Sequence, residues 1–279
     1  MKKVVKFGGS SLASAEQFKK VGDIIRSDES RRYVVPSAPG KRHSGDTKVT
    51  DLLYKCYGQA ILDDDREEDF EEILKVIKDR YDSIINGLEL TISLDDEFKT
   101  IRENFSKKIG RDYAASRGEY LNGIIMAAYL GYEFIDAAEV IFFDEEGEFD
   151  AEKTNEVLSE RLAHTERAVI PGFYGSNPDG TIHTFSRGGS DITGSIVARA
   201  VHADMYENWT DVSGFLIADP RIIKNPKAID VITYRELREL SYMGATVLHE
   251  DAIFPVRREG IPINIRNTNA PEDKGTLIV

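Results

Sequence analysis

Apolar and polar residues alternate along the chain in short blocks that predict strands and helices in turn. Residues 4–7 form an apolar run typical of a buried strand, and a Gly-Gly-Ser segment at 8–10 follows it as a loop. Apolar residues then recur at helical spacing over 18–25, which predicts a helix with one buried face. A strand, a glycine loop and a helix in this order form a common phosphate-binding arrangement.

The same alternation continues to the end of the chain. A strand is predicted at 33–35, and a helix that begins near Thr50 carries the single cysteine, Cys56, as a small buried residue. The other predicted strands are 133–136, 140–143, 167–171, 204–209 and 262–266, and further helices are predicted at 151–163, 191–202, 234–243 and 245–257. This alternation predicts an α/β fold, a three-layer α/β/α arrangement with a mainly parallel central sheet.

Ligands of such sheets bind where loops leave the carboxyl ends of the strands. The loops expected at this edge are Gly8-Gly9, Ser37, Gly172-Phe173 and Thr210-Asp211.

Residues 60–115 differ in character from the rest. An acidic run over 63–72 precedes apolar residues at helical spacing, which predicts a helical lobe inserted into the α/β frame. We interpret the acidic run as the solvated face of a helix, because it lacks the spaced glycine of a calcium-binding loop. Residues 1–279 are therefore expected to form one domain with a helical insertion at about 60–115.

Composition limits the classes of partner. The net charge of −13 argues against nucleic acid or an anionic membrane as the main partner. One cysteine excludes an intramolecular disulfide, and the five histidines show no zinc-ligand spacing. The chain opens without the apolar run of a signal peptide, and no window is long and apolar enough to span a membrane. A cytoplasmic protein is the expectation.

The stretch 184–195 carries the densest candidate chemistry. Two glycines, Gly188 and Gly189, permit a tight turn, and Ser190 or Asp191 is expected to cap the helix that follows. A helix amino end preceded by Arg187 is suited to binding a carboxylate or phosphate. A glycine loop that merely joins a strand to a helix is the alternative interpretation of this stretch alone.

A set of motifs spread over the whole chain resembles the catalytic domain of aspartate kinases, in the amino-acid-kinase superfamily. In chain order the motifs are Lys-Phe-Gly-Gly-Ser-Ser from Lys6, Ser37-Ala, Thr50-Asp-Leu-Leu, Ser116-Arg-Gly-Glu119, Gly172-Phe173, Ser-Arg-Gly-Gly-Ser-Asp-Ile-Thr from Ser186, Trp209-Thr-Asp-Val and Asp219-Pro-Arg221. The resemblance implies the amino-acid-kinase fold and ATP-dependent phosphorylation of L-aspartate to 4-phospho-L-aspartate. This reaction begins the synthesis of lysine, threonine and methionine.

The resemblance also assigns roles to residues. Lys6 and Asp191 are the expected catalytic residues, although helix capping alone would also explain Asp191. Arg187 is similar to the residue that binds the substrate α-carboxylate, and Glu119 to the one that binds its α-ammonium. The remaining substrate-binding residues are expected to be Ser37, Thr50, Phe173 and Ser190. The nucleotide-binding residues are expected to be Lys6, Gly8, Gly9, Ser10, Thr210, Asp211, Leu216, Arg221 and Thr246, whereas Trp209 is compatible with a place in the core.

These residue types suit the reaction. The β-carboxylate of aspartate is ionised at neutral pH, so its attack on the γ-phosphorus requires alignment and charge neutralisation but no general base. The expected cofactors are ATP and Mg²⁺, and no protein ligand of the metal is assigned.

Three positions depart from the family pattern. Thr246 stands where many aspartate kinases have a lysine that faces the ATP phosphates, Leu216 stands in place of a tyrosine, and Glu250 in place of a proline. Lys224 or Lys227 supplying the missing charge is a hypothesis.

The family usually continues beyond a segment like 271–279 into two ACT-type regulatory domains. We expect no regulatory domain in this chain, and therefore no feedback inhibition by lysine or threonine. Whether the sequence is part of a longer chain or the protein lacks this module stays open. The resemblance also allows a homodimer.

Two alternatives to an aspartate kinase remain. A related kinase acting on glutamate, acetylglutamate, carbamate or a nucleoside monophosphate would share the fold and the ATP site. A non-catalytic amino-acid-binding subunit would keep the pocket without turnover, as the loss of a lysine at Thr246 would allow.

Overall fold

The computed structural model describes residues 1–62, 67–186, 188–218, 222–224, 226–242, 248 and 253–279. Within this part of the chain, eight strands form one sheet in the order β3-β4-β2-β1-β7-β9-β10-β8. They are β1 (Lys3–Phe7), β2 (Arg31–Pro36), β3 (Glu133–Phe134), β4 (Ala168–Val169), β7 (Met205–Thr210), β8 (Val231–Ile232), β9 (Ile263–Asn267) and β10 (Thr276–Ile278). The sheet is parallel from β3 to β9, and β10 pairs antiparallel with β9. A separate antiparallel hairpin consists of β5 (Tyr174–Ser176) and β6 (Ile182–Thr184).

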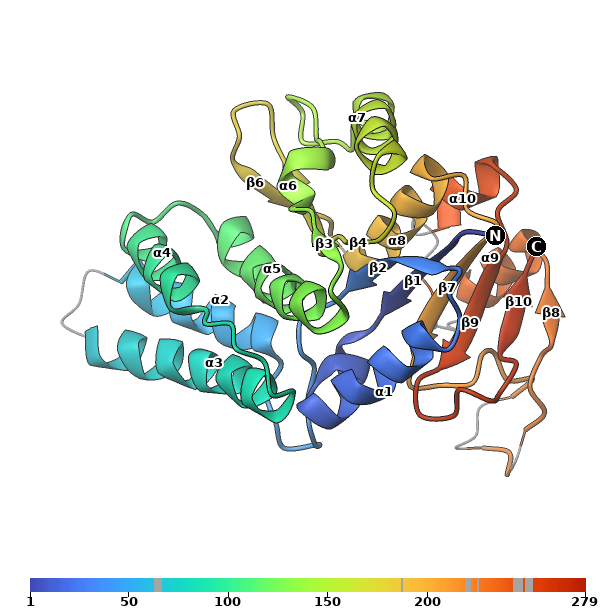
Figure 1. Cartoon of the computed structure of the whole chain (residues 1–279), viewed down its shortest axis with the longest axis horizontal. Coiled ribbons are helices and arrows are strands. Elements are labelled where there is room, and N and C mark those ends of the chain that lie inside the picture. Colours follow the sequence, from blue (N-terminus) through green and yellow to red (C-terminus); the bar gives the residue numbers. More distant parts are fainter. Residues whose placement is uncertain (63–66, 187, 219–221, 225, 243–247, 249–252) are drawn as a thin grey trace.

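Helices cover both faces of the sheet (Figure 1). They are α1 (Ala15–Arg26), α2 (Val49–Ala60), α3 (Glu67–Gly87), α4 (Asp95–Ser106), α5 (Arg111–Leu130), α6 (Ala137–Val140), α7 (Ala151–Ala163), α8 (Gly189–Ala200), α9 (Tyr234–Tyr242) and α10 (Phe254–Arg258), with a 3₁₀ turn η1 at Gly9–Leu12. Successive strand residues point to opposite faces. Val4 and Val35 join the core under α7 and α8, whereas Val5 and Val34 join the core under α1 and α5. The predicted three-layer α/β fold is confirmed.

The helices α2, α3, α4 and α5 pack together beside the sheet and share its second core (Figure 1). Their contact is made by buried apolar side chains such as Leu53, Ile77, Phe105 and Leu121. In the predicted helical segment, residues 67–87 form α3 and residues 95–106 form α4. In the acidic run, Asp69 and the described neighbours at 68 and 72 are exposed, as expected for the solvated face of a helix.

One predicted strand is wrong. Residues 140–143 were expected to be a strand because they are apolar, but Val140 ends the helix α6 and only Phe142 and Phe143 make isolated bridges. The reason is local: the Asp136 side chain accepts a hydrogen bond from the Ala138 N–H and so caps a helix ahead of the apolar run. Of the helix predicted at 245–257, only the part from 254 is observed, and 243–247 and 249–252 lie outside the described residues.

Candidate active site

The loops after β1, β2, β4 and β7 meet at the carboxyl edge of the sheet. The Gly8 N–H donates to the Trp209 carbonyl at 3.0 Å, and the Gly172 N–H donates to the Pro36 carbonyl at 3.1 Å. The Ser37 N–H donates to the carbonyl of Phe7, the last residue of β1, also at 3.0 Å. These bonds bring together loops that lie far apart in the sequence, as predicted for the ligand edge of a parallel sheet.

A buried ion pair lies at the centre of this edge. Lys6 of β1 is only 8% exposed, and its Nζ lies 2.5 Å from Asp191 Oδ1. Asn208 of β7 is the register partner of Lys6, and its Nδ2 donates to the same carboxylate oxygen at 2.8 Å. The Tyr206 hydroxyl donates to the Asp191 backbone carbonyl at 3.1 Å. The ammonium group of Lys6 is thereby held in one place, and Asn208 is a site residue that the sequence did not reveal.

The helix α8 begins differently from the expectation. Gly188 occupies the N-cap position with φ of 60°, in the left-handed region that favours glycine, and no side chain caps the helix. The prediction that Ser190 or Asp191 caps it is therefore wrong, because the Asp191 carboxylate is engaged by the ion pair instead. Ser190 is buried against the loop after β4: a Cβ on Gly172 would lie 2.6 Å from its Oγ.

The glycine loops leave no room for side chains. A Cβ on Gly9 would lie 2.9 Å from the Ala38 carbonyl oxygen, and one on Gly40 would lie 2.5 Å from the carbonyl carbon of Gly9. The Gly40 N–H donates to the Gly9 carbonyl at 2.8 Å, so the loops after β1 and β2 are joined directly. Gly8 lies next to the ion pair, with its Cβ position 3.7 Å from Lys6 Nζ. The backbone from Gly8 into η1, which includes Ser10, therefore runs close to a fixed positive charge.

Glu119 of α5 presents a buried acidic group to the loop after β2. Its side chain is 6% exposed and lies close to the Ala38 N–H, and its Oε2 is buried without a partner. Burial raises the pKa of Glu119 to about 8, although the nearby Ala38 N–H opposes the shift. Thr50 lies nearby, because a Cβ on Gly118 would approach both Thr50 Oγ1, at 3.8 Å, and the Ala38 side chain. An unpartnered buried acceptor of this kind is suited to a ligand that brings N–H donors.

Asn122 lies one helical turn after Glu119 and is also missing from the predicted site. It is fully buried, and its Nδ2 donates to the Ser37 carbonyl at 2.7 Å. Its Oδ1 is buried and has no partner. The i, i+3 spacing from Glu119 on one helix face is the signal that would have found it.

Phe173 holds a strained backbone conformation beside α8. Its φ of 83° is unusual for a residue other than glycine and costs about 1–3 kcal/mol. The Thr193 hydroxyl accepts its N–H at 3.1 Å, and its carbonyl accepts the Phe185 N–H at 2.9 Å. A Cβ on Gly189 would lie 2.6 Å from the Phe173 ring. The loop after β4 is thus held against the first turn of α8.

Three of the residues predicted for the nucleotide, Thr210, Asp211 and Leu216, lie at or after the end of β7. Thr210 ends β7, and its hydroxyl donates to the exposed Asp211 carboxylate at 3.3 Å. Leu216 is 38% exposed and forms a backbone bridge with Ala228. Three predicted site residues, Arg187, Arg221 and Thr246, lie outside the described residues.

Trp209 belongs to the core, as one interpretation of the sequence allowed. It is 1% exposed, and its ring stacks on Phe7 with centroids 5.9 Å apart. The guanidinium groups of Arg31 and Arg266 lie 5.2 Å and 4.6 Å from its centroid, and its Nε1–H donates to the buried Glu207 at 2.9 Å.

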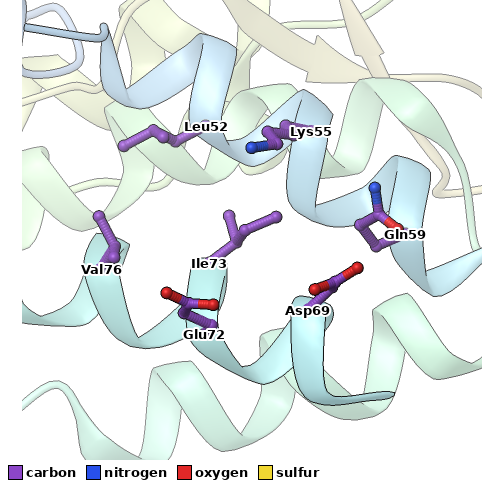
Figure 2. Close-up of a pocket in the computed structure, with 7 residues that line it drawn as sticks. All are labelled: Leu52, Lys55, Gln59, Asp69, Glu72, Ile73 and Val76. Atoms are coloured by element: carbon purple, nitrogen blue, oxygen red, sulfur yellow. The ribbon is translucent and has the colours of Figure 1, made fainter. Parts of the chain in front are cut away.

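A separate cavity of about 440 Å³ lies between α2 and α3 (Figure 2). Lys55 and Gln59 line it from α2, and Asp69, Glu72 and Ile73 line it from α3. It contains none of the residues predicted for the site.

The described residues contain no group of three His, Cys, Asp or Glu side chains that could hold a metal ion. Nor does any helix among them have the length and apolar character needed to cross a membrane.

The fold and its ligand edge define the class of protein. Residues 1–267 match the amino acid kinase family, and the chain belongs to that family. It is 42% identical to Aspartokinase 3 of Bacillus subtilis over 292 residues, which include 99% of this chain and 63% of the relative. The solved aspartate kinase of Clostridium acetobutylicum is 57% identical with a TM-score of 0.92, covering 99% of this chain and 62% of its own.

Aspartokinase III of Escherichia coli, solved in complex with aspartate and ADP, is 28% identical with a TM-score of 0.86, and the match covers 100% of this chain and 64% of that one. The chain therefore spans less than two thirds of the length of each of these three proteins.

Proposed function

We propose that this chain catalyses the ATP-dependent phosphorylation of the L-aspartate β-carboxylate to 4-phospho-L-aspartate, the first step of lysine, threonine and methionine synthesis. The observation that carries the proposal is the pairing of two features at one sheet edge. The Lys6–Asp191 ion pair lies beside the glycine loop, and Glu119 of α5, with its unpartnered oxygen, lies against the loop after β2. The similarity to aspartate kinases, one of them solved with aspartate and ADP, supports the same assignment.

The amino-acid end of the site is proposed to lie between α5 and the loops after β2 and β4. Glu119 would accept the substrate ammonium group, which supplies the donors that its free oxygen lacks. Arg187 is proposed to bind the α-carboxylate, as the resemblance implies. The pocket would be completed by Ser37, Thr50, Phe173 and Ser190.

The phosphate end is proposed to lie at Lys6 and the backbone of Gly8, Gly9 and Ser10. Charge builds up on the oxygens of the transferred phosphoryl group, and an ammonium ion held in place stabilises it without reorganisation. Asp191 keeps Lys6 in that position through the 2.5 Å ion pair. The nucleotide would be bound further by Thr210, Asp211, Leu216, Arg221 and Thr246, with Lys224 or Lys227 as candidate replacements for the missing lysine.

ATP and Mg²⁺ are the proposed cofactors. Gly8, whose Cβ position lies 3.7 Å from Lys6 Nζ, leaves bare backbone beside that ammonium group, which fits a phosphate chain. The ion is proposed to be held mainly by phosphate oxygens and water, as Mg²⁺ commonly is at ATP sites. When bound with ATP, Mg²⁺ would neutralise charge on the phosphates.

The test is ADP release measured with L-aspartate, glutamate, acetylglutamate, carbamate and a nucleoside monophosphate as separate acceptors. ADP release is expected with aspartate, and hydroxylamine should trap the acyl phosphate product. Lys6→Ala should lower kcat by about 100-fold or more. Lys19→Ala, on the exposed face of α1, is the control and should leave kcat unchanged. Preference for another acceptor, or equal activity in Lys6→Ala, would refute the proposal.

The proposal includes the cytoplasm as the compartment and allows a homodimer. Light scattering of the purified chain measures whether it forms a homodimer.

A further inference from the structure

Asn122 of α5 holds the peptide group that begins the loop after β2. Its Nδ2 donates a hydrogen bond to the Ser37 carbonyl at 2.7 Å. Glu119, three residues earlier on the same helix, lies close to the Ala38 N–H of that peptide, which favours the ionised carboxylate. Glu119 and Asn122 therefore both face the start of the loop after β2.

Each of these side chains keeps one oxygen without a partner. Glu119 Oε2 and Asn122 Oδ1 are both buried and unbonded. The orientation of the Asn122 amide is set by the Ser37 carbonyl, which requires an N–H donor, so the remaining atom is an acceptor. Leaving a buried acceptor unpaired is unfavourable, and two on one helix face point to a ligand that brings several donors.

We propose that Asn122 is a specificity-determining residue for the amino-acid substrate, and that its Oδ1 accepts a hydrogen bond from the substrate ammonium group beside Glu119. This inference rests on the proposed function and adds a residue to it. An ammonium group has three donors, so it can satisfy both oxygens and still bond elsewhere. The bound ammonium group favours the ionised form of Glu119, so Glu119 then supplies the charge, and Asn122 supplies an uncharged acceptor that fixes the direction of approach.

A purely structural role for Asn122 makes a different prediction. If Asn122 only holds the Ser37–Ala38 peptide, its loss would move the loop and lower the affinity for every dicarboxylate ligand equally. If Oδ1 binds the ammonium, its loss would weaken only ligands that carry an amino group. L-aspartate and butanedioate, the same dicarboxylate without the amino group, separate the two roles.

The experiment measures the dissociation constants of both ligands by calorimetry and competition, with steady-state kinetics, on the full chain. Asn122→Leu keeps the approximate size and removes both polar atoms, whereas Asn122→Asp removes the donor and keeps acceptors. Asn122→Leu should raise the dissociation constant for aspartate about tenfold or more and that for butanedioate less than about twofold. The KM for aspartate should rise, and kcat should stay within about twofold of the wild type. Asn122→Asp should bind aspartate more tightly than Asn122→Leu does. Asn86→Leu, exposed on α3, is the matched control and should change neither ligand.

Equal weakening of both ligands in Asn122→Leu, or an equal loss in the Leu and Asp variants, would overturn the inference. Thermal unfolding shows whether each variant is folded. If Asn122→Leu does not fold, Asn122→Ser replaces it, since it retains a hydroxyl for the Ser37 carbonyl and removes Oδ1. A wild-type chain that neither binds nor phosphorylates aspartate would instead refute the proposed function.

Discussion

The buried carboxyl group of Glu119 should make the protein less stable as pH rises, and Glu119→Gln should remove this effect. Burial raises the pKa of Glu119 in the folded chain to about 8, from an ordinary value of 4.5. Between these two values the folded chain binds more protons than the unfolded chain, so the free energy of unfolding falls as pH rises. The contribution is fully present below about pH 4.5 and is lost above about pH 8.

The shift sets the size of the effect. Each pKa unit corresponds to about 1.4 kcal/mol, so the full loss between pH 4.5 and 8 is at most about 5 kcal/mol. Glutamine has the shape of the protonated acid and does not ionise. The free energy of unfolding of the variant should therefore match that of the wild type near pH 4.5 and exceed it by roughly 3–5 kcal/mol at pH 9. It should also bind aspartate more weakly, because the charge that attracts the ammonium group is gone.

The assay is urea unfolding at several pH values from 4.5 to 9, followed by the fluorescence of Trp209, which is the only tryptophan and is buried. The quantity compared is the difference in unfolding free energy between the variant and the wild type. Glu103→Gln, on the exposed face of α4, is the control and should show a difference that does not change with pH. A Glu119→Gln difference that is equally flat would refute the reasoning.

Two further substitutions test other parts of the site, and one labelling experiment tests the core. Asn208→Leu removes the amide that supports the carboxylate paired with the β1 lysine, so kcat should fall about tenfold with the KM for aspartate nearly unchanged; an unchanged kcat would show that the amide is dispensable. Gly40→Ala places a Cβ 2.5 Å from backbone of Gly9, so the KM for ATP should rise and the unfolding free energy should fall by about 1–3 kcal/mol. Gly58→Ala, where a Cβ meets nothing within 4 Å, is the control and should not weaken the protein. Burial raises the pKa of the Cys56 thiol to about 12, so thiol reagents at pH 8 should react only after unfolding, and fast labelling of the folded chain would contradict this.

Local signals in the sequence predicted elements well where they agreed with the packing. The helix at 151–163 was predicted with its observed bounds, because Asp150 caps it and Leu158 and Leu162 face the core. Residues 140–143 show the opposite case. Their apolar run is typical of a strand, but a helix capped by Asp136 extends into it.

Some residues of the candidate site could likewise be predicted from the sequence, and others could not. Motifs indicated Lys6 and Glu119, and the structure places Glu119 of α5 against the loop after β2, which is bonded to the end of β1. Asn122 could have been found from its spacing to Glu119 on one helix. Asn208 could not, because its place beside Lys6 depends on the pairing of β1 with β7, and no local pattern encodes that register.

The central position of β1 has a consequence for biogenesis. Its partner β7 is made about two hundred residues later, which takes roughly 10–40 s at ordinary rates of translation. Until then the backbone N–H and C=O groups on that edge of β1 have no partner strand, and the emerging chain is prone to aggregation. Contacts at such separation also give a high contact order, so we expect slow refolding from urea and a need for chaperones at high expression.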